Sequence, residues 1–270
     1  MRNQRDRATN KHINLADIVK AEEYVGLVQS SIESTTGKID NHIKQFYRIE
    51  RYKKCLSRVP KDARLILDAG CGDGRFAEYF LKNISNGEVR LIGVDLSWPK
   101  ISFAKCRGNK NKMNADFIVA DVHNLPFKGE SFNLIISLET LEHCLAPEIV
   151  LREFLRVVIR NKHEFEFLLT VPFTKKNNIE CVHSLKDVYN IDNESLNIYH
   201  KEYKLDECIK LLNSNGIEVS GFEKISRKNS NVFTKLGPFV PNILIKMTYR
   251  ILNVFSKSPY SVLYIGKASK

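Results

Sequence analysis

Three side chains that could carry chemistry stand close together in the stretch Glu139-Thr140-Leu141-Glu142-His143. On a helical turn, spacings of three and four residues put Glu139, Glu142 and His143 on one face. Two carboxylates and an imidazole can ligate a divalent cation. Without a metal, His143 is the best general base, because the unperturbed pKa of histidine suits neutral pH. A structural role also fits, in which the glutamate caps a helix or orients a bound molecule.

A glycine-rich segment, Asp68-Ala69-Gly70-Cys71-Gly72-Asp73-Gly74, follows the short apolar run Leu65-Ile66-Leu67. Glycines at alternate positions let the backbone turn tightly and approach a ligand without side-chain collision. A helix that begins directly after such a loop points its N-terminal amides at the same place. The segment predicts a ligand-binding loop, although an ordinary strand-to-helix turn could have this composition.

Two further carboxylates come at the ends of predicted strands. Asp95 ends the run Leu91-Ile92-Gly93-Val94, where it could accept hydrogen bonds from both hydroxyls of a ribose. Asp121 follows Phe117-Ile118-Val119, where a short carboxylate could accept from an exocyclic adenine amine. Each of them could instead be a solvated loop residue or a helix cap.

The elements that must position these residues alternate between strand and helix. Such alternation predicts βαβ units and a mostly parallel sheet whose ligands bind at the carboxyl ends of the strands. The expected strands are 65–67, 89–94, 117–119, 132–137, 165–171, 217–222 and 262–265, and the expected helices are 39–56, 76–81, 99–106, 148–158 and 205–214.

The glycine loop and the two carboxylates, in this order and spacing, resemble class I S-adenosylmethionine-dependent methyltransferases, most of all the group related to quinone-biosynthesis methyltransferases. The resemblance covers about residues 64–222. It implies a Rossmann-like α/β fold, with a mostly parallel seven-stranded sheet and helices on both faces. It also implies that the cofactor is held by residues of the loop and of the strand ends: Asp68, Gly70, Cys71, Gly72, Gly74, Asp95, Leu96, Asp121, Val122 and Leu138. A nicotinamide dehydrogenase is less compatible, because it needs a wider glycine spacing.

The pattern E-x-x-E-H is similar to that of ubiquinone O-methyltransferases and small-RNA 2′-O-methyltransferases, in which it holds a metal. That likeness implies a Mg²⁺ or Mn²⁺ site at Glu139, Glu142 and His143, with His200 as a further ligand and His183 as a weaker substitute. Glu142 and His143 are then also the candidate catalytic residues.

Composition limits the expected partners and cellular location of the chain. The formal net charge of +11 favours phosphate-bearing partners or an anionic membrane face, or reflects only a solvated basic surface. The six scattered cysteines form no C-x-x-C pair, and the charged start has no apolar core, so we expect neither a zinc site nor a secretory signal. No apolar run of about 18 residues occurs, which predicts a cytoplasmic chain without a membrane span.

The domain prediction is a polar N-terminal extension at 1–38 and a methyltransferase domain at 39–270, with an insertion at about 226–260. In that insertion, Lys246, Arg250, Asn253 and Lys257 form a polar stripe on an otherwise apolar helix. Such a helix could lie on a membrane surface, cover a lipophilic substrate, or pack as a lid or dimer contact. The oligomeric state stays open.

Three functions follow as hypotheses. The first is O-methylation of a small or lipid-linked acceptor. The second is a metal-dependent RNA 2′-O-methyltransferase, which ranks lower because aromatic and basic residues do not interleave strongly. The third is a binding module that keeps the cofactor fold without turnover.

Overall fold

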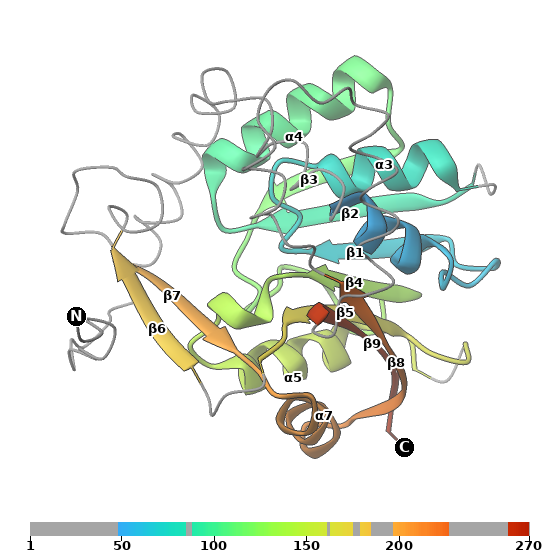
Figure 1. Ribbon diagram of the computed structural model, residues 1–270. Helices are drawn as coiled ribbons and strands as arrows, with labels where there is room; N and C mark the ends of the chain where they lie inside the picture. Colours follow the sequence, from blue (N-terminus) through green and yellow to red (C-terminus); the bar gives the residue numbers. More distant parts are fainter. Residues whose placement is uncertain are drawn as a thin grey trace, which may run out of the picture.

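The computed structural model describes residues 48–84, 88–160, 163–174, 179–184, 197–226 and 259–269. Its centre is a seven-stranded sheet in the order β3-β2-β1-β4-β5-β9-β8 (Figure 1). Strands β3, β2, β1, β4 and β5 run parallel, and β9 pairs antiparallel with both β5 and β8. The strands are β1 (Leu65–Ala69), β2 (Arg90–Asp95), β3 (Ala115–Val119), β4 (Leu134–Leu138), β5 (Phe167–Pro172), β8 (Ile217–Ser226) and β9 (Pro259–Ala268). The predicted mostly parallel, seven-stranded Rossmann-like fold is confirmed.

The central strands are buried because helices cover both faces of the sheet. Every residue of β4 and β5 is buried, as expected for strands that are covered on both sides. Side chains alternate between two apolar clusters along each strand. In β4, for example, Ile135 belongs to one cluster, and Leu134 and Ile136 belong to the other.

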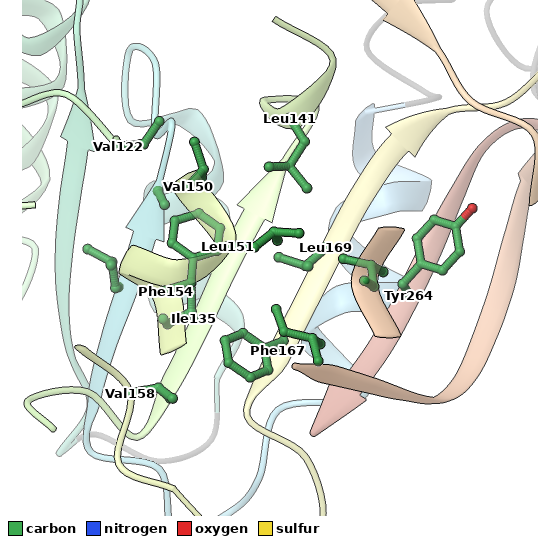
Figure 2. Close-up of a cluster of buried hydrophobic side chains, with 14 of the residues drawn as sticks. Val122, Ile135, Leu141, Val150, Leu151, Phe154, Val158, Phe167, Leu169 and Tyr264 are labelled. Carbon is green, nitrogen blue, oxygen red and sulfur yellow. The ribbon is translucent and has the colours of Figure 1, made fainter. Parts of the chain in front are cut away.

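Each face has its own helices. The first cluster is covered by α5 (Pro147–Val157) and α7 (Leu205–Ser214), and Figure 2 shows Phe154 of α5 facing this cluster. The second is covered by α3 (Arg75–Asn83), α4 (Trp98–Asn111) and the helical segment 48–56. These positions confirm the predicted helices on both faces.

One pair of strands was not predicted. Strands β6 (Ile179–Ser184) and β7 (Asn197–Glu202) form a separate two-stranded antiparallel sheet beside the main one. Their sequences, IECVHS and NIYHKE, are polar enough that a periodicity reading takes them as loop. The backbone pairing of the two strands with each other defines them.

Two regions of the domain prediction lie outside the described residues: the N-terminal extension at 1–38 and almost all of the insertion at 226–260. Within the described part of the chain, no helix is long and apolar enough to cross a membrane.

Candidate functional site

The glycine-rich loop connects β1 to α3 through three left-handed residues. Gly70, Gly72 and Gly74 have φ values of 80°, 54° and 77°, which residues other than glycine adopt only at a cost in free energy. The amides of Gly70 and Cys71 both donate to the carbonyl of Val94, at 2.8 and 2.9 Å. The loop is therefore fastened to the end of β2, the neighbouring strand.

Two of these glycines differ in what surrounds them. A Cβ atom on Gly70 would lie 2.1 Å from the hydroxyl of Thr140, so the protein itself fills that space. A Cβ atom on Gly72 would meet nothing within 4 Å. Gly72 therefore borders open space at the carboxyl ends of the strands, where ligands of such sheets bind.

Asp68 lies beneath the loop and is only 1% exposed. Its Oδ2 atom is buried and has no hydrogen-bond partner among the residues that the structure describes. Burial raises the pKa of this carboxyl to about 8; the negative charge of Asp95 adds to the rise, and the positive charge of Arg51 opposes it. A cationic ligand group, such as an ammonium, would complement the ionised form.

Asp95 ends β2 and connects the glycine loop with the start of α4. One carboxylate oxygen accepts from the amide of Gly72 and the other from the amide of Ser97, both at 2.9 Å. Asp95 thus holds the glycine loop, a role that sequence spacing alone does not reveal. Each carboxylate oxygen has a second lone pair, so the predicted ribose contact stays compatible with this geometry. Leu96 is half-buried beside it.

Asp121 follows β3 and is fixed by the next turn of the chain. Its Oδ1 atom lies 2.7 Å from Nδ1 of His123 and accepts from the His123 amide at 2.9 Å. These contacts, with the side-chain bond foremost, lower the pKa of Asp121 and keep it ionised. An ionised acceptor suits the predicted adenine amine. Val122, Leu138 and Cys71 are buried around the same strand ends.

The predicted helical turn that would place Glu139, Glu142 and His143 on one face is wrong. Glu139 has a left-handed φ of 58°, and the short 3₁₀ helix Leu141–His143 begins only after it. The Glu139 carboxylate lies 3.2 Å from Nη1 of Arg51 and accepts from the hydroxyl of Ser261 at 2.9 Å. The sharp turn at Glu139 thus directs this side chain to an ion pair.

His143 lies where the 3₁₀ helix meets β7. Its Nδ1 atom is 2.9 Å from the carbonyl of Tyr199, and its Nε2 atom is 3.9 Å from Oε1 of Glu142. The ring of His200 is 5.4 Å away, centroid to centroid. Glu142 is almost fully buried, whereas the His143 side chain is 37% exposed. The imidazole can therefore meet a bound molecule.

The predicted metal ligands do not converge. Across the described ranges, no group of three or more His, Cys, Asp or Glu side chains could hold a metal ion. Glu142, His143 and His200 are neighbours, but Glu139 is held by Arg51 and Ser261. The four residues do not fit a Mg²⁺ or Mn²⁺ site. The side chain of His183 lies outside the described part.

Arg51 and the Tyr199 carbonyl are site features that sequence reasoning missed. Arg51, from the helical segment 48–56, pairs with Glu139 and lies near enough to Asp68 to affect its pKa. An arginine on an amphipathic helix reads as a solvated charge, and a backbone carbonyl leaves no mark in the sequence. No local signal could have found either contact.

Comparisons with known proteins agree with this geometry. Residues 67–163 match a family described as a methyltransferase domain. The ubiquinone biosynthesis O-methyltransferase of Bartonella tribocorum is 28% identical over 38% of this chain and 40% of its own length. Phthiotriol/phenolphthiotriol dimycocerosates methyltransferase 1 of Mycobacterium ulcerans is 28% identical over 48% of this chain and 45% of its own length. The chain thus spans less than half the length of these two relatives.

A solved structure extends the likeness to nearly the whole chain. The 1,6-didemethyltoxoflavin-N1-methyltransferase of Burkholderia thailandensis, with bound S-adenosylhomocysteine, has a TM-score of 0.53 and 17% identity. The alignment covers 93% of this chain and 91% of that one. At this identity the likeness to the solved structure shows the fold alone. The likeness to class I S-adenosylmethionine-dependent methyltransferases thus rests on the sequence match over residues 67–163 and on the shared fold.

Proposed function

We propose that this chain uses S-adenosylmethionine to methylate a hydroxyl on a small or lipid-linked acceptor. When bound, S-adenosylmethionine supplies a methyl group on a sulfonium sulfur, which an oxygen nucleophile can displace. The observation that carries the proposal is the open space beside Gly72, whose amide donates to the carboxylate of Asp95 at the same strand ends.

The cofactor fits the residues present at these strand ends. Asp68 offers a buried carboxylate oxygen to the ammonium of the methionine part. Asp95 and Asp121 offer carboxylate lone pairs to the ribose hydroxyls and the adenine amine. Both side chains are already fixed by backbone amides, at Ser97 and His123 respectively, so little further ordering is needed on binding.

His143 is the proposed general base for the acceptor hydroxyl. A carbonyl oxygen only accepts hydrogen bonds, so the contact with Tyr199 requires a proton on Nδ1 of His143. The neutral ring then carries its lone pair on Nε2, which can take the proton that the hydroxyl loses. Glu142, 3.9 Å from Nε2, stabilises the imidazolium that results.

The relatives support the acceptor class. Their printed names include an O-methyltransferase of ubiquinone biosynthesis and a methyltransferase of phthiotriol dimycocerosates. Neither name refers to a nucleic acid. A small or lipid-linked acceptor is therefore preferred to RNA, and any peripheral membrane contact is a further part of this proposal.

The experiment compares His143→Gln with the wild type. Binding of S-adenosylhomocysteine is measured by calorimetry, and methyl transfer from radiolabelled S-adenosylmethionine is measured with a dihydroxybenzoate and with a hydroxylated fatty acid. We expect unchanged binding and transfer reduced by about 10²- to 10⁴-fold, the usual contribution of a general base. Full transfer by His143→Gln would refute the assigned base. Cofactor binding without transfer by the wild type to any hydroxyl acceptor would favour a binding module.

A further inference from the structure

The peptide between Asp73 and Gly74 closes the glycine loop directly before α3. On one side it is bounded by Gly74, whose φ of 77° is in the left-handed region. Because glycine has no Cβ atom, its neighbouring peptides rotate with little steric resistance. The loop therefore needs contacts that select one orientation of this peptide.

Two hydrogen bonds fix that orientation, one at each end of the peptide. The amide of Gly74 donates to the carbonyl of Cys71 at 3.2 Å, within the loop itself. The carbonyl of Asp73 accepts from Nε of Arg107 at 3.0 Å, from another helix. The next carbonyl, that of Gly74, accepts from the amide of Glu78 at 2.9 Å and so begins α3. A turned peptide would disturb both the loop and the helix start.

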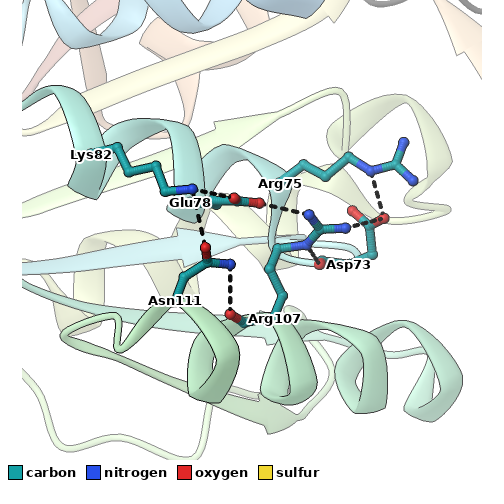
Figure 3. A network of polar contacts seen from close by, with 6 residues as sticks. All are labelled: Asp73, Arg75, Glu78, Lys82, Arg107 and Asn111. Carbon is teal, nitrogen blue, oxygen red and sulfur yellow. Dashed lines mark hydrogen bonds and ion pairs between the residues drawn. The ribbon is translucent and has the colours of Figure 1, made fainter.

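Arg107 is itself held firmly on α4. Its Nη1 atom donates to Oε2 of Glu78 at 2.6 Å, and its Nη2 atom lies 3.7 Å from the Asp73 carboxylate (Figure 3). Nε of Arg75 reaches the same Asp73 oxygen at 2.8 Å, so two guanidinium groups flank one carboxylate. These contacts connect the loop, α3 and α4 in one network. The guanidinium of Arg107 donates from Nε to the Asp73 carbonyl and from Nη1 to Glu78, and a single ammonium cannot reproduce this spacing of two separate nitrogen donors.

Helix α4 also supports the loop by direct packing. A Cβ atom on Gly74 would lie 3.1 Å from the Cβ of Ala104, one turn before Arg107. The same helix starts at Trp98, directly after the Asp95 and Ser97 contact. Thus α4 connects the strand end at Asp95 with the glycine loop, and Arg107 is its polar contact with the loop backbone.

We infer that Arg107 is a positioning residue for the cofactor: it selects the orientation of the Asp73–Gly74 peptide that the bound cofactor requires. This inference rests on the proposed function, because it assumes that the loop binds S-adenosylmethionine. Arg107 acts on the loop backbone, through its hydrogen bond to the Asp73 carbonyl. Its loss lowers the fraction of binding-competent loop, and the apparent affinity falls by that fraction.

The test is the conservative pair Arg107→Lys and Arg90→Lys. Lysine at 107 keeps the positive charge beside Glu78 but has no counterpart of Nε–H for the Asp73 carbonyl. Arg90 is a matched control, because its Nε and Nη2 both contact Asp116 at an exposed position at the start of β2, the end away from the loop. Affinity for S-adenosylhomocysteine is measured by calorimetry, and stability by urea unfolding. Arg107→Gln serves as a second variant.

We expect Arg107→Lys to weaken S-adenosylhomocysteine binding by about five- to tenfold, as the loss of one charge-assisted hydrogen bond would do. The KM for S-adenosylmethionine should rise by the same factor with kcat unchanged, because the loop binds ground state and transition state alike. Arg90→Lys should match the wild type in both. Wild-type affinity in Arg107→Lys and Arg107→Gln would overturn the inference while the proposed function stands. No binding by the wild type would instead overturn the proposed function.

Discussion

Substituting Gly72 by alanine separates the effect on folding from the effect on the cofactor. At φ 54°, a residue with a Cβ atom costs about 1–2 kcal/mol of unfolding free energy. No protein atom within 4 Å obstructs the new methyl group, so no clash adds to this cost. The methyl group does, however, project into the space that we assign to the cofactor.

The expected loss of affinity follows from overpacking. Inserting a methyl group into a filled site costs about 1–3 kcal/mol, which raises the dissociation constant roughly five- to 150-fold. The backbone strain is present in the free and bound protein alike and largely cancels in binding. Urea unfolding measures the loss of unfolding free energy, and calorimetry with S-adenosylhomocysteine measures the loss of affinity.

Gly70→Ala is the matched counterpart. Its Cβ atom would lie 2.1 Å from the Thr140 hydroxyl, so the methyl group clashes with the protein without any ligand. We expect a larger loss of stability than for Gly72→Ala. If Gly72→Ala binds S-adenosylhomocysteine as the wild type does, the open space beside Gly72 is not the cofactor site and this reasoning is refuted.

Three further predictions concern pH, metal and packing. The pKa of Asp68 is raised to about 8, so folding takes up a proton between pH 4 and 8. The unfolding free energy of the wild type should therefore fall, relative to that of Asp68→Asn, as pH rises through this window. Urea unfolding should give a slope of at most about 1.4 kcal/mol per pH unit. A chelator should leave methyl transfer unchanged, since the predicted ligands do not converge; loss of activity that Mg²⁺ restores would contradict this. Phe154→Ala, in the cluster under α5, should lower unfolding free energy by about 3–5 kcal/mol without changing cofactor affinity.

The fold was predictable because strand and helix periods differ sharply in this chain. The runs at β1, β4 and β5 are apolar except for Asp68, Ser137 and Thr170, and the helices that follow carry one apolar face. The hairpin of β6 and β7 was not predictable, since cross-strand pairing between polar segments has no periodic signature. The predicted positions of the glycine loop, Asp95 and Asp121 at strand ends are confirmed; their contacts with a cofactor stay predictions.

The metal prediction shows where local spacing fails. Spacings of three and four residues mean a shared face only on a continuous helix. Here the left-handed residue Glu139 stands before the 3₁₀ helix, and the long-range partners Arg51 and Ser261 bind its carboxylate. Contacts with residues far apart in the sequence determine where the Glu139 side chain points. The spacing of residues within one segment carries no information about such contacts.

The most direct test of the account is isothermal titration of the wild-type chain with S-adenosylhomocysteine, alongside Asp95→Ala. Asp95 holds the Gly72 amide and offers the ribose acceptor, so its loss removes both the loop contact and the ligand contact. The account predicts saturable binding at one site by the wild type and much weaker binding by the variant. Wild-type protein that does not bind, or a variant that binds equally well, would contradict the placement of the cofactor at these strand ends.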